Sequence, residues 1–229
     1  MSDPGAPRPI SPQDLRRWSD ALSGIARTGL GFTESIYERE RFEEILAVAA
    51  DIRVAAGSLF DTDHFVEEWL KGVVDGVPGY QTPKVAIGAV VGNDDGELLL
   101  VQRADSGVWL YPTGWADIGY SPAEIAVKEV AEETGIDCVV DGVLMVLDGQ
   151  RLGFTTIPLY SIVFLCRAVG GELRPHPLET TAVGFFGRDD LPAPLAGFDQ
   201  WGDHVFGALA GDDVGVWFDV PRGEVWRNE

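Results

Sequence analysis

The sequence has little cysteine, little positive charge and no long hydrophobic run. Only two of its 229 residues are cysteines. Cys138 and Cys166 lack the spacing of a metal-ligand pair, which argues against a disulfide scaffold or a zinc finger and favours buried, reduced thiols. Lysine and arginine number 17 against 37 acidic residues, which gives a formal charge of -20 and a pI near 4.3. This charge opposes electrostatic binding to DNA or to an anionic membrane.

The sequence also lacks an apolar run long enough to span a membrane. Residues 1–9 are proline-rich and have neither the charged nor the apolar region of a signal peptide, so we expect a cytoplasmic protein with a disordered N-terminus. His64, His176 and His204 are scattered without ligand spacing. We therefore expect each histidine to be structural or exposed.

What the sequence does contain is a segment, residues 114–136, that predicts one turn and one helix. The segment reads GWADIGYSPAEIAVKEVAEETGI. Ser121 and Glu124 form a capping box with proline at the first helical position, and Gly135 follows the last turn. We therefore expect a helix from Pro122 to Thr134.

The helical period of 3.6 residues predicts two faces for this helix. The expected buried stripe contains Ala123, Ala126, Val127, Val130 and Thr134. Glu129, Glu132 and Glu133 then lie together on another face, where like charges destabilise a helix by about 0.2 to 0.5 kcal/mol per pair. Bound cations are the simplest compensation, and oxygen ligands without a paired histidine or thiol suit Mg²⁺ or Mn²⁺.

A merely solvated acidic face would give the same three glutamates. The loop in front of the helix, residues 111–119, favours a binding site, because Gly114 and Gly119 allow the backbone to approach a ligand closely.

The segment resembles the Nudix box, usually written G-x5-E-x7-R-E-U-x-E-E-x-G-U with U a bulky aliphatic residue. The matching positions are Gly114, Glu129, Val130, Glu132, Glu133, Gly135 and Ile136. Lys128 stands where the motif has arginine, Tyr120 where it has its first glutamate, and Thr113 where a Gly-Gly pair usually begins. Lysine keeps the positive charge but loses the planar two-pronged geometry of arginine.

The resemblance implies a metal-dependent hydrolase that cleaves a nucleoside diphosphate linked to another group, giving a nucleoside monophosphate and a phosphorylated product. Glu129 and Glu133 would be the principal ligands of Mg²⁺ or Mn²⁺, Glu132 a third, and the Thr113 carbonyl would complete the shell. Such a metal neutralises phosphate charge and lowers the pKa of an attacking water. Glu132, Glu133 and Glu179 are the catalytic candidates, and the sequence does not choose between Glu132 and Glu179 as general base.

Glu179 is included because it precedes a predicted strand by the offset at which several Nudix enzymes carry a further metal-binding or base-forming glutamate. Arg103 and Tyr120 are the substrate candidates. Arg103, at a strand end, suits a two-pronged bond to a phosphate. Tyr120 offers an aromatic ring to a base or to a quaternary ammonium group.

The elements around the box fit an α/β/α sandwich with a mixed sheet, as the resemblance implies. Period-two patterns and a turn at residues 94–96 predict a strand, a hairpin and a strand. We expect these strands at 84–91 and 97–103, later strands at 138–147, 157–167 and 182–186, and a closing helix at 198–209.

The chain before this domain is predicted to be a small all-helical module. Ser11 opens a first helix that we expect to break at residues 29–31, Thr33 caps the second, and a third spans 63–74. So small a core favours packing against a second subunit, hence a homodimer. We expect a disordered segment at 1–9, the helical module at 10–76, a linker at 77–83 and the Nudix hydrolase domain at 84–229.

This arrangement is similar to a bacterial Nudix subfamily with an N-terminal helical dimerisation module, including CDP-choline pyrophosphatases. CDP-choline is therefore the first substrate candidate and ADP-ribose the second. An RNA end is disfavoured by charge, although a metal ion could admit it. Two alternatives stay open: a catalytically weak or inactive nucleotide-binding sensor, favoured by Tyr120 and Lys128, and a structural dimer with a solvated acidic helix.

Overall fold

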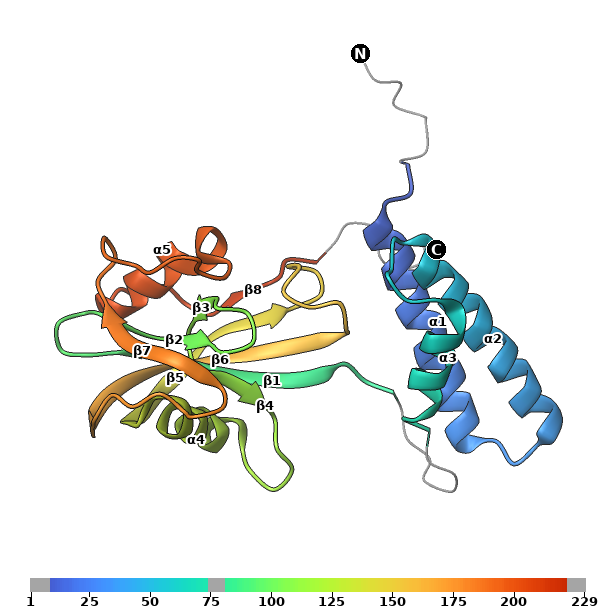
Figure 1. Cartoon of the computed structure of the whole chain (residues 1–229), viewed down its shortest axis with the longest axis horizontal. Helices are drawn as coiled ribbons and strands as arrows, with labels where there is room; N and C mark the ends of the chain where they lie inside the picture. The colour runs from blue at the N-terminus through green and yellow to red at the C-terminus, as the bar shows by residue number, and fades with distance from the viewer. Residues whose placement is uncertain (1–8, 74–80, 222–229) are drawn as a thin grey trace, which may run out of the picture. The chain divides into compact units, whose positions relative to one another are not determined.

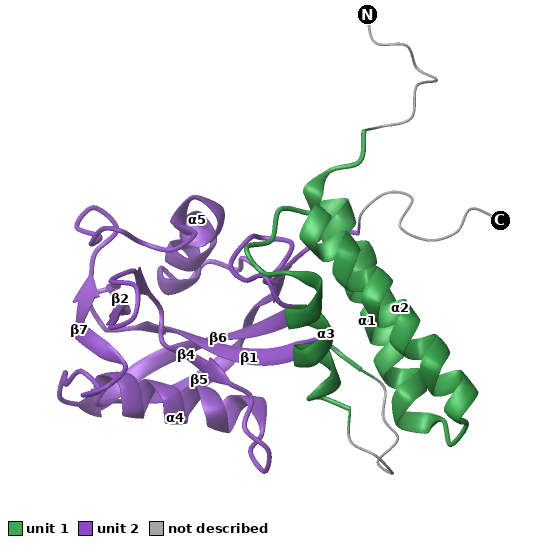
Figure 2. Ribbon diagram, turned by 45° about the vertical axis from the view of Figure 1, so that its right-hand side comes forward, with its two compact units in different colours: residues 1–82 green, residues 83–229 purple. Residues whose placement is uncertain are grey.

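The chain forms two compact units, residues 1–82 and 83–229, which Figure 2 shows in different colours. The computed structural model describes residues 9–73 and 81–221. The expected disordered segment, apart from Pro9, and residues 77–80 of the expected linker lie outside the described residues. Within the described residues, no helix is both long and apolar enough to cross a membrane.

The first unit begins with α1 (Pro12–Phe32), which opens at the predicted capping box. The Ser11 amide donates to the Asp14 carboxylate over 2.9 Å, and the Asp14 amide donates back to Ser11 Oγ over 3.2 Å. The predicted break at residues 29–31 is wrong, because α1 continues to Phe32. Gly29 serves close packing instead: a Cβ there would overlap the ring of Phe42.

The described part of this unit contains two further helices, α2 (Ile36–Ala55) and α3 (Thr62–Leu70). The cap of α2 is Ser35, whose Oγ accepts from the Glu38 amide over 3.4 Å, so the expected cap at Thr33 is wrong. The helices enclose a small core of Ala26, Leu30 and Leu46, with Phe42, Ile45, Trp69, Leu70 and Val73 packed against it.

The second unit contains an eight-stranded sheet in the order β3-β2-β1-β6-β5-β8, with β4 also paired to β1 and β7 to β2. The β1–β6 and β5–β8 pairs are parallel and the others antiparallel, so the sheet is mixed. The strands are β1 (Lys84–Gly92), β2 (Leu98–Arg103), β3 (Trp109–Leu110), β4 (Thr113–Trp115), β5 (Ile136–Asp148), β6 (Leu159–Gly171), β7 (Thr180–Phe186) and β8 (Trp217–Phe218).

One helix covers each face of this sheet, α4 (Pro122–Thr134) below and α5 (Phe198–Leu209) above in the view of Figure 1. The core under α5 includes Trp201, Val205 and Phe206, and the core over α4 includes Ile125 and Val130. The predicted α/β/α sandwich after an N-terminal helical module is confirmed, and α5 has the predicted ends.

Candidate functional site

The candidate site is built on α4, whose two ends are fixed by its own sequence. The Ser121 amide donates to Glu124 Oε2 over 2.6 Å, and the Glu124 amide donates to Ser121 Oγ over 3.3 Å. At the other end Gly135 has a φ of 74° and donates its N–H to the Ala131 carbonyl over 3.0 Å. Glycine suits this left-handed position, where other residues are strained.

The buried face of α4 differs from the predicted stripe. Its buried residues are Ile125, Ala126, Val130, Glu133 and Thr134. Val127, predicted to be buried, is 37% exposed, whereas Ile125, which the prediction omitted, is 1% exposed. The face in contact with the sheet is therefore turned relative to the prediction, and this brings a glutamate to the buried side.

Glu133 is that glutamate, and only 7% of its surface is exposed. Its Oε2 accepts the Thr113 N–H of β4 over 3.1 Å. Burial, helped by the negative charges of Glu129 and Glu179, raises the pKa of Glu133 to about 7, although the Thr113 N–H and Arg103 oppose this. A carboxyl with this pKa is easily protonated unless a positive charge approaches it.

Glu129 lies one turn earlier, against Gly114. A Cβ on Gly114 would overlap the Glu129 carboxylate, so glycine is required for this approach. The Glu129 side chain is 12% exposed, and burial raises its pKa, while Lys128 opposes the rise. The two most buried carboxylates of the motif therefore converge on the Thr113–Gly114 segment.

Glu132 differs from these two glutamates, because its carboxylate is paired with Lys128. Lys128 Nζ lies 2.9 Å from Glu132, 3.5 Å from Asp117 and 3.7 Å from Glu129. The Glu132 side chain is 53% exposed, and its bond to Lys128 is the main reason that the pKa of Lys128 is raised. The lysine in the arginine position of the motif thus joins an exposed glutamate to a mostly buried one.

Glu179 is supplied by a turn that docks on the C-terminal end of α4. The His176 amide and Thr180 Oγ1 both donate to the Glu133 carbonyl over 3.3 Å, and the Arg174 amide donates to the Thr134 carbonyl over 2.8 Å. Glu179 contributes to the raised pKa of both Glu129 and Glu133, so its charge is within electrostatic reach of them. His176 Nδ1 lies 3.8 Å from Glu179 Oε2 and makes no hydrogen bond.

Arg103 lies at the end of β2, and its guanidinium already makes a bidentate bond to Asp105. Arg103 Nε donates to Asp105 Oδ1 over 2.9 Å and Nη2 donates to Oδ2 over 2.5 Å. This bond, and more weakly the charges of Glu133 and Glu179, raise the pKa of Arg103. Asp105 belongs to no motif in the sequence, although its position two residues beyond the arginine was a signal for a local pair.

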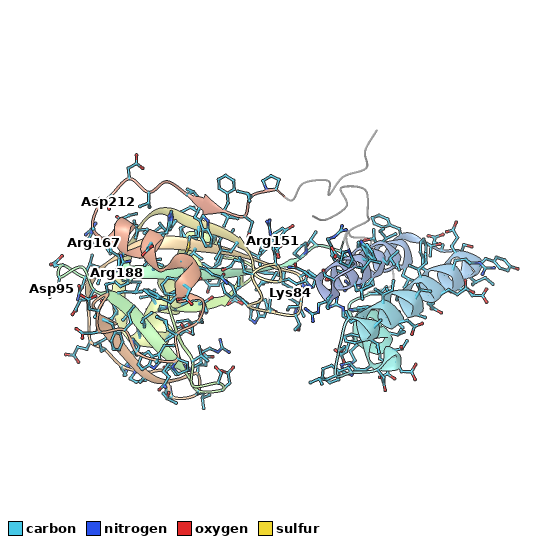
Figure 3. The ribbon with its side chains drawn as sticks, turned by 90° about the horizontal axis from the view of Figure 1, so that it is seen from above. Lys84, Asp95, Arg151, Arg167, Arg188 and Asp212 are labelled. Atoms are coloured by element: carbon cyan, nitrogen blue, oxygen red, sulfur yellow. The ribbon has the colours of Figure 1, made fainter. Side chains whose placement is uncertain are left out.

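Tyr120 is 54% exposed and lines an open hollow rather than the space between the glutamates. The lining of this hollow includes neither Glu129 nor Glu133. Another aromatic ring, Trp115 at the end of β4, is 52% exposed, and Lys84 Nζ lies 5.1 Å from its centroid. Figure 3 labels Lys84 at the start of β1, with Asp95 beyond the other end of that strand.

The residues present fit a hard divalent cation. Glu129 and Glu133 converge, Glu179 adds negative charge, and burial raises the pKa of both carboxyls, so a cation would stabilise their charged forms. Oxygen donors of this kind suit Mg²⁺ or Mn²⁺. Across residues 9–73 and 81–221, however, no three His, Cys, Asp or Glu side chains are already grouped to hold an ion. A third carboxylate would have to move toward Glu129 and Glu133 to complete such a group.

The fold and the acidic helix define a class of hydrolases that act on phosphate anhydrides, and comparisons identify the family. The NUDIX domain family matches residues 82–206, and the UDP-X-like N-terminal oligomerisation domain matches residues 13–59. The chain therefore belongs to the Nudix family, as its box predicted, and it is a Nudix pyrophosphohydrolase.

Several relatives are similar over most of their length. The putative ADP-ribose pyrophosphatase YjhB of Bacillus subtilis is 34% identical over 177 residues, which cover 76% of this chain and 81% of that protein. An ADP-ribose pyrophosphatase structure from Streptococcus suis has 35% identity and a TM-score of 0.53, over 60% of this chain and all of that one. A UDP-X diphosphatase structure has 27% identity and a TM-score of 0.55, over 92% of this chain and 100% of its own.

Proposed function

We propose that this protein uses Mg²⁺ or Mn²⁺ to hydrolyse the pyrophosphate of a nucleoside diphosphate linked to another group. The products are a nucleoside monophosphate and a phosphorylated second product. The observation that carries this proposal is the convergence of Glu129 and Glu133 on the Thr113–Gly114 segment, with the charge of Glu179 in reach. The bound metal would neutralise the diphosphate and lower the pKa of the attacking water.

Each residue of the site has a distinct part in this proposal. Glu129 and Glu133 hold the metal, with Glu132 and the Thr113 carbonyl as further oxygen donors. The Thr113 N–H orients the Glu133 carboxylate through their 3.1 Å hydrogen bond. Glu133 must lose its proton before it can bind a cation, and a pKa of about 7 allows this near neutral pH.

The general base is Glu179 rather than Glu132 in this proposal. Glu132 is paired with Lys128 at 2.9 Å, so its carboxylate would have to leave that ion pair before it could meet a water. Glu179 has a 60% exposed side chain on the turn that docks against Glu133, so it has room to meet a water. Arg103 would bind a phosphate oxygen after leaving Asp105, and Tyr120 would contact the group attached to the diphosphate.

ADP-ribose is the first substrate candidate, since the relatives from Bacillus subtilis and Streptococcus suis carry that name. A uridine diphosphate derivative comes next, because the UDP-X diphosphatase resembles the chain over both units. CDP-choline, the first candidate from the sequence, follows them. The half-exposed Trp115 ring offers a stacking surface for a base.

We further propose that residues 10–76 form the dimerisation module, residues 77–83 the linker and residues 84–229 the catalytic domain. Support comes from the match to an oligomerisation domain over residues 13–59. Support also comes from large apolar side chains of this unit that are more than half exposed, a property of surfaces that are covered in assemblies. They include Ile25, Phe32, Ile36, Tyr37, Leu59 and Phe60.

The deciding experiment is product analysis with the full-length protein, its Glu133→Gln variant and a control variant, Glu172→Gln, whose side chain is exposed. Each is incubated with Mg²⁺ or Mn²⁺ and ADP-ribose, UDP-linked sugars, CDP-choline, NADH or dinucleoside polyphosphates, and chromatography measures the nucleoside monophosphate. We expect cleavage of one substrate class, lost about 10²-fold or more in Glu133→Gln and kept in Glu172→Gln.

Near-normal turnover in Glu133→Gln would remove Glu133 from the metal shell. If no substrate is cleaved but calorimetry shows saturable metal binding, the nucleotide-binding sensor is favoured. If no substrate is cleaved and metal binding is not saturable, the structural dimer is favoured.

A further inference from the structure

The two cysteines, far apart in the sequence, are neighbours in the sheet. In the antiparallel register Cys138 of β5 lies opposite Ala168, and Cys166 of β6 lies opposite Val140. The two cysteines are therefore diagonal neighbours, and residues two positions apart on a strand point to the same face. Both belong to the buried cluster that packs under α4.

The two thiols influence each other's ionisation, and they are unequal. Interaction with the Cys166 thiol lowers the pKa of Cys138, although burial opposes this. Interaction with Cys138, together with burial, raises the pKa of Cys166. Cys138 is thus the thiol that more readily becomes a thiolate, the nucleophilic form.

Cys138 is also the more solvent-accessible of the two cysteines. Cys138 is 7% exposed and Cys166 is 2% exposed. Cys138 also lines the open hollow of about 500 Å³ between α4 and β5, together with Tyr120, Ala123, Glu124, Val127, Val139 and Val140. This lining is mostly apolar, so it admits a small uncharged molecule to the Cys138 sulfur while Cys166 stays behind it.

We propose that Cys138 and Cys166 form a reversible dithiol–disulfide pair, in which Cys138 reacts with a small peroxide and Cys166 resolves the product. The lining of this hollow includes none of the glutamates assigned to the hydrolase chemistry. The disulfide would fasten the start of β5, which directly follows α4, to β6.

The chemical step balances with hydrogen peroxide as the oxidant. The Cys138 thiolate attacks one peroxide oxygen, the O–O bond breaks, and hydroxide leaves, so that Cys138 becomes a sulfenic acid. The Cys166 sulfur then attacks the Cys138 sulfur, the S–O bond breaks, and water leaves with the Cys166 proton. The two thiols lose two electrons in total, and one peroxide is reduced to two waters.

The test uses the full-length protein treated with hydrogen peroxide, blocked with N-ethylmaleimide, digested and examined by mass spectrometry. We expect a cross-linked peptide pair containing Cys138 and Cys166, formed within one chain and reversed by dithiothreitol. Two matched variants separate the roles. In Cys166→Ala, dimedone should trap a sulfenic acid on Cys138, whereas in Cys138→Ala, Cys166 should react only after denaturation.

Several results would overturn the proposal: both thiols still free after peroxide treatment, sulfinic acid on Cys138 without a cross-link, or a disulfide only between two chains. Equal peroxide reactivity of the remaining thiol in the two variants would also overturn it. Because the peptide map of the unsubstituted chain needs no variant, a variant that fails to fold leaves the test intact.

Discussion

Three glutamates of one helix differ in their surroundings, although their residue type is the same. Glu133 is 7% exposed, the Glu129 side chain is 12% exposed, and the Glu132 side chain is 53% exposed and bonded to Lys128. Their chemistry follows these surroundings, because burial penalises the charged form and a neighbouring cation favours it. Only Glu129 and Glu133 combine burial with convergence on the loop.

The raised pKa of Glu133 makes the stability of the metal-free protein depend on pH. The folded value of about 7 lies above the ordinary value of 4.5, so the folded chain binds more protons than the unfolded chain between these values. The proton's stabilising effect is complete below about pH 4.5 and is lost as the pH rises through about 7. Between roughly pH 6 and 8 in chelator, we expect the free energy of unfolding of the unsubstituted protein to fall by about 1 kcal/mol more than that of Glu133→Gln. Urea denaturation at each pH measures both values. Equal slopes in the two proteins would contradict this.

Gly114 should tolerate no side chain, because a Cβ there would overlap the Glu129 carboxylate. Displacing that carboxylate by about 1 Å costs on the order of 10²-fold in rate. We expect Gly114→Ala to lose metal-dependent turnover by that factor and to bind Mg²⁺ more weakly in calorimetry. Gly187→Ala is the matched control, since a Cβ at Gly187 meets nothing within 4 Å. Similar activity in the two variants would refute the tight approach of Glu129 to Gly114.

At the scale of elements, the end of α4 and the turn before β7 act as one structure. The Glu133 carbonyl at the end of α4 accepts from the His176 amide and from Thr180 Oγ1. The His176 amide also donates to Thr180 Oγ1 over 2.7 Å. The turn that carries Glu179 is therefore fixed to the helix that carries Glu129.

Removing the Thr180 hydroxyl should loosen this attachment. Thr180→Val keeps the shape of a side chain that is 6% exposed but deprives the Glu133 carbonyl and the His176 amide of a partner. We expect a loss of about 1 to 3 kcal/mol in unfolding free energy, together with slower turnover. The control is Thr181→Val, whose exposed hydroxyl bonds to Gln102, with an expected change within about 0.5 kcal/mol. Equal losses in urea denaturation would mean that Thr180 is not the attachment.

At the scale of the whole molecule, each unit has its own core, and the first unit matches an oligomerisation domain. Deleting residues 1–76 should therefore give a folded monomer, because the exposed apolar side chains of that unit are removed. Sedimentation velocity measures the mass, and circular dichroism checks that the remaining domain keeps its structure. A dimer that survives the deletion would place the subunit interface in the Nudix domain.

The sequence by itself determined the family, the limits of α4 and α5, and the segment on which the site is built. The family, α4 and the site segment follow from local signals: a capping box, a left-handed glycine and a motif within 23 residues. The limits of α5 follow from its hydrophobic periodicity. The break predicted in α1 is wrong, because Gly29 is needed for close packing against Phe42, a residue of the next helix, and not for a turn among its chain neighbours.

Only the tertiary structure decided which carboxylates converge and which partners they have. The burial of Glu133 and the exposure of Val127 depend on how α4 is turned against the sheet, and periodicity alone does not fix that rotation. The diagonal placement of Cys138 and Cys166 depends on the register of β5 with β6. Such contacts join segments that are distant in the sequence, and the energies that select them come from packing, which a local pattern does not contain.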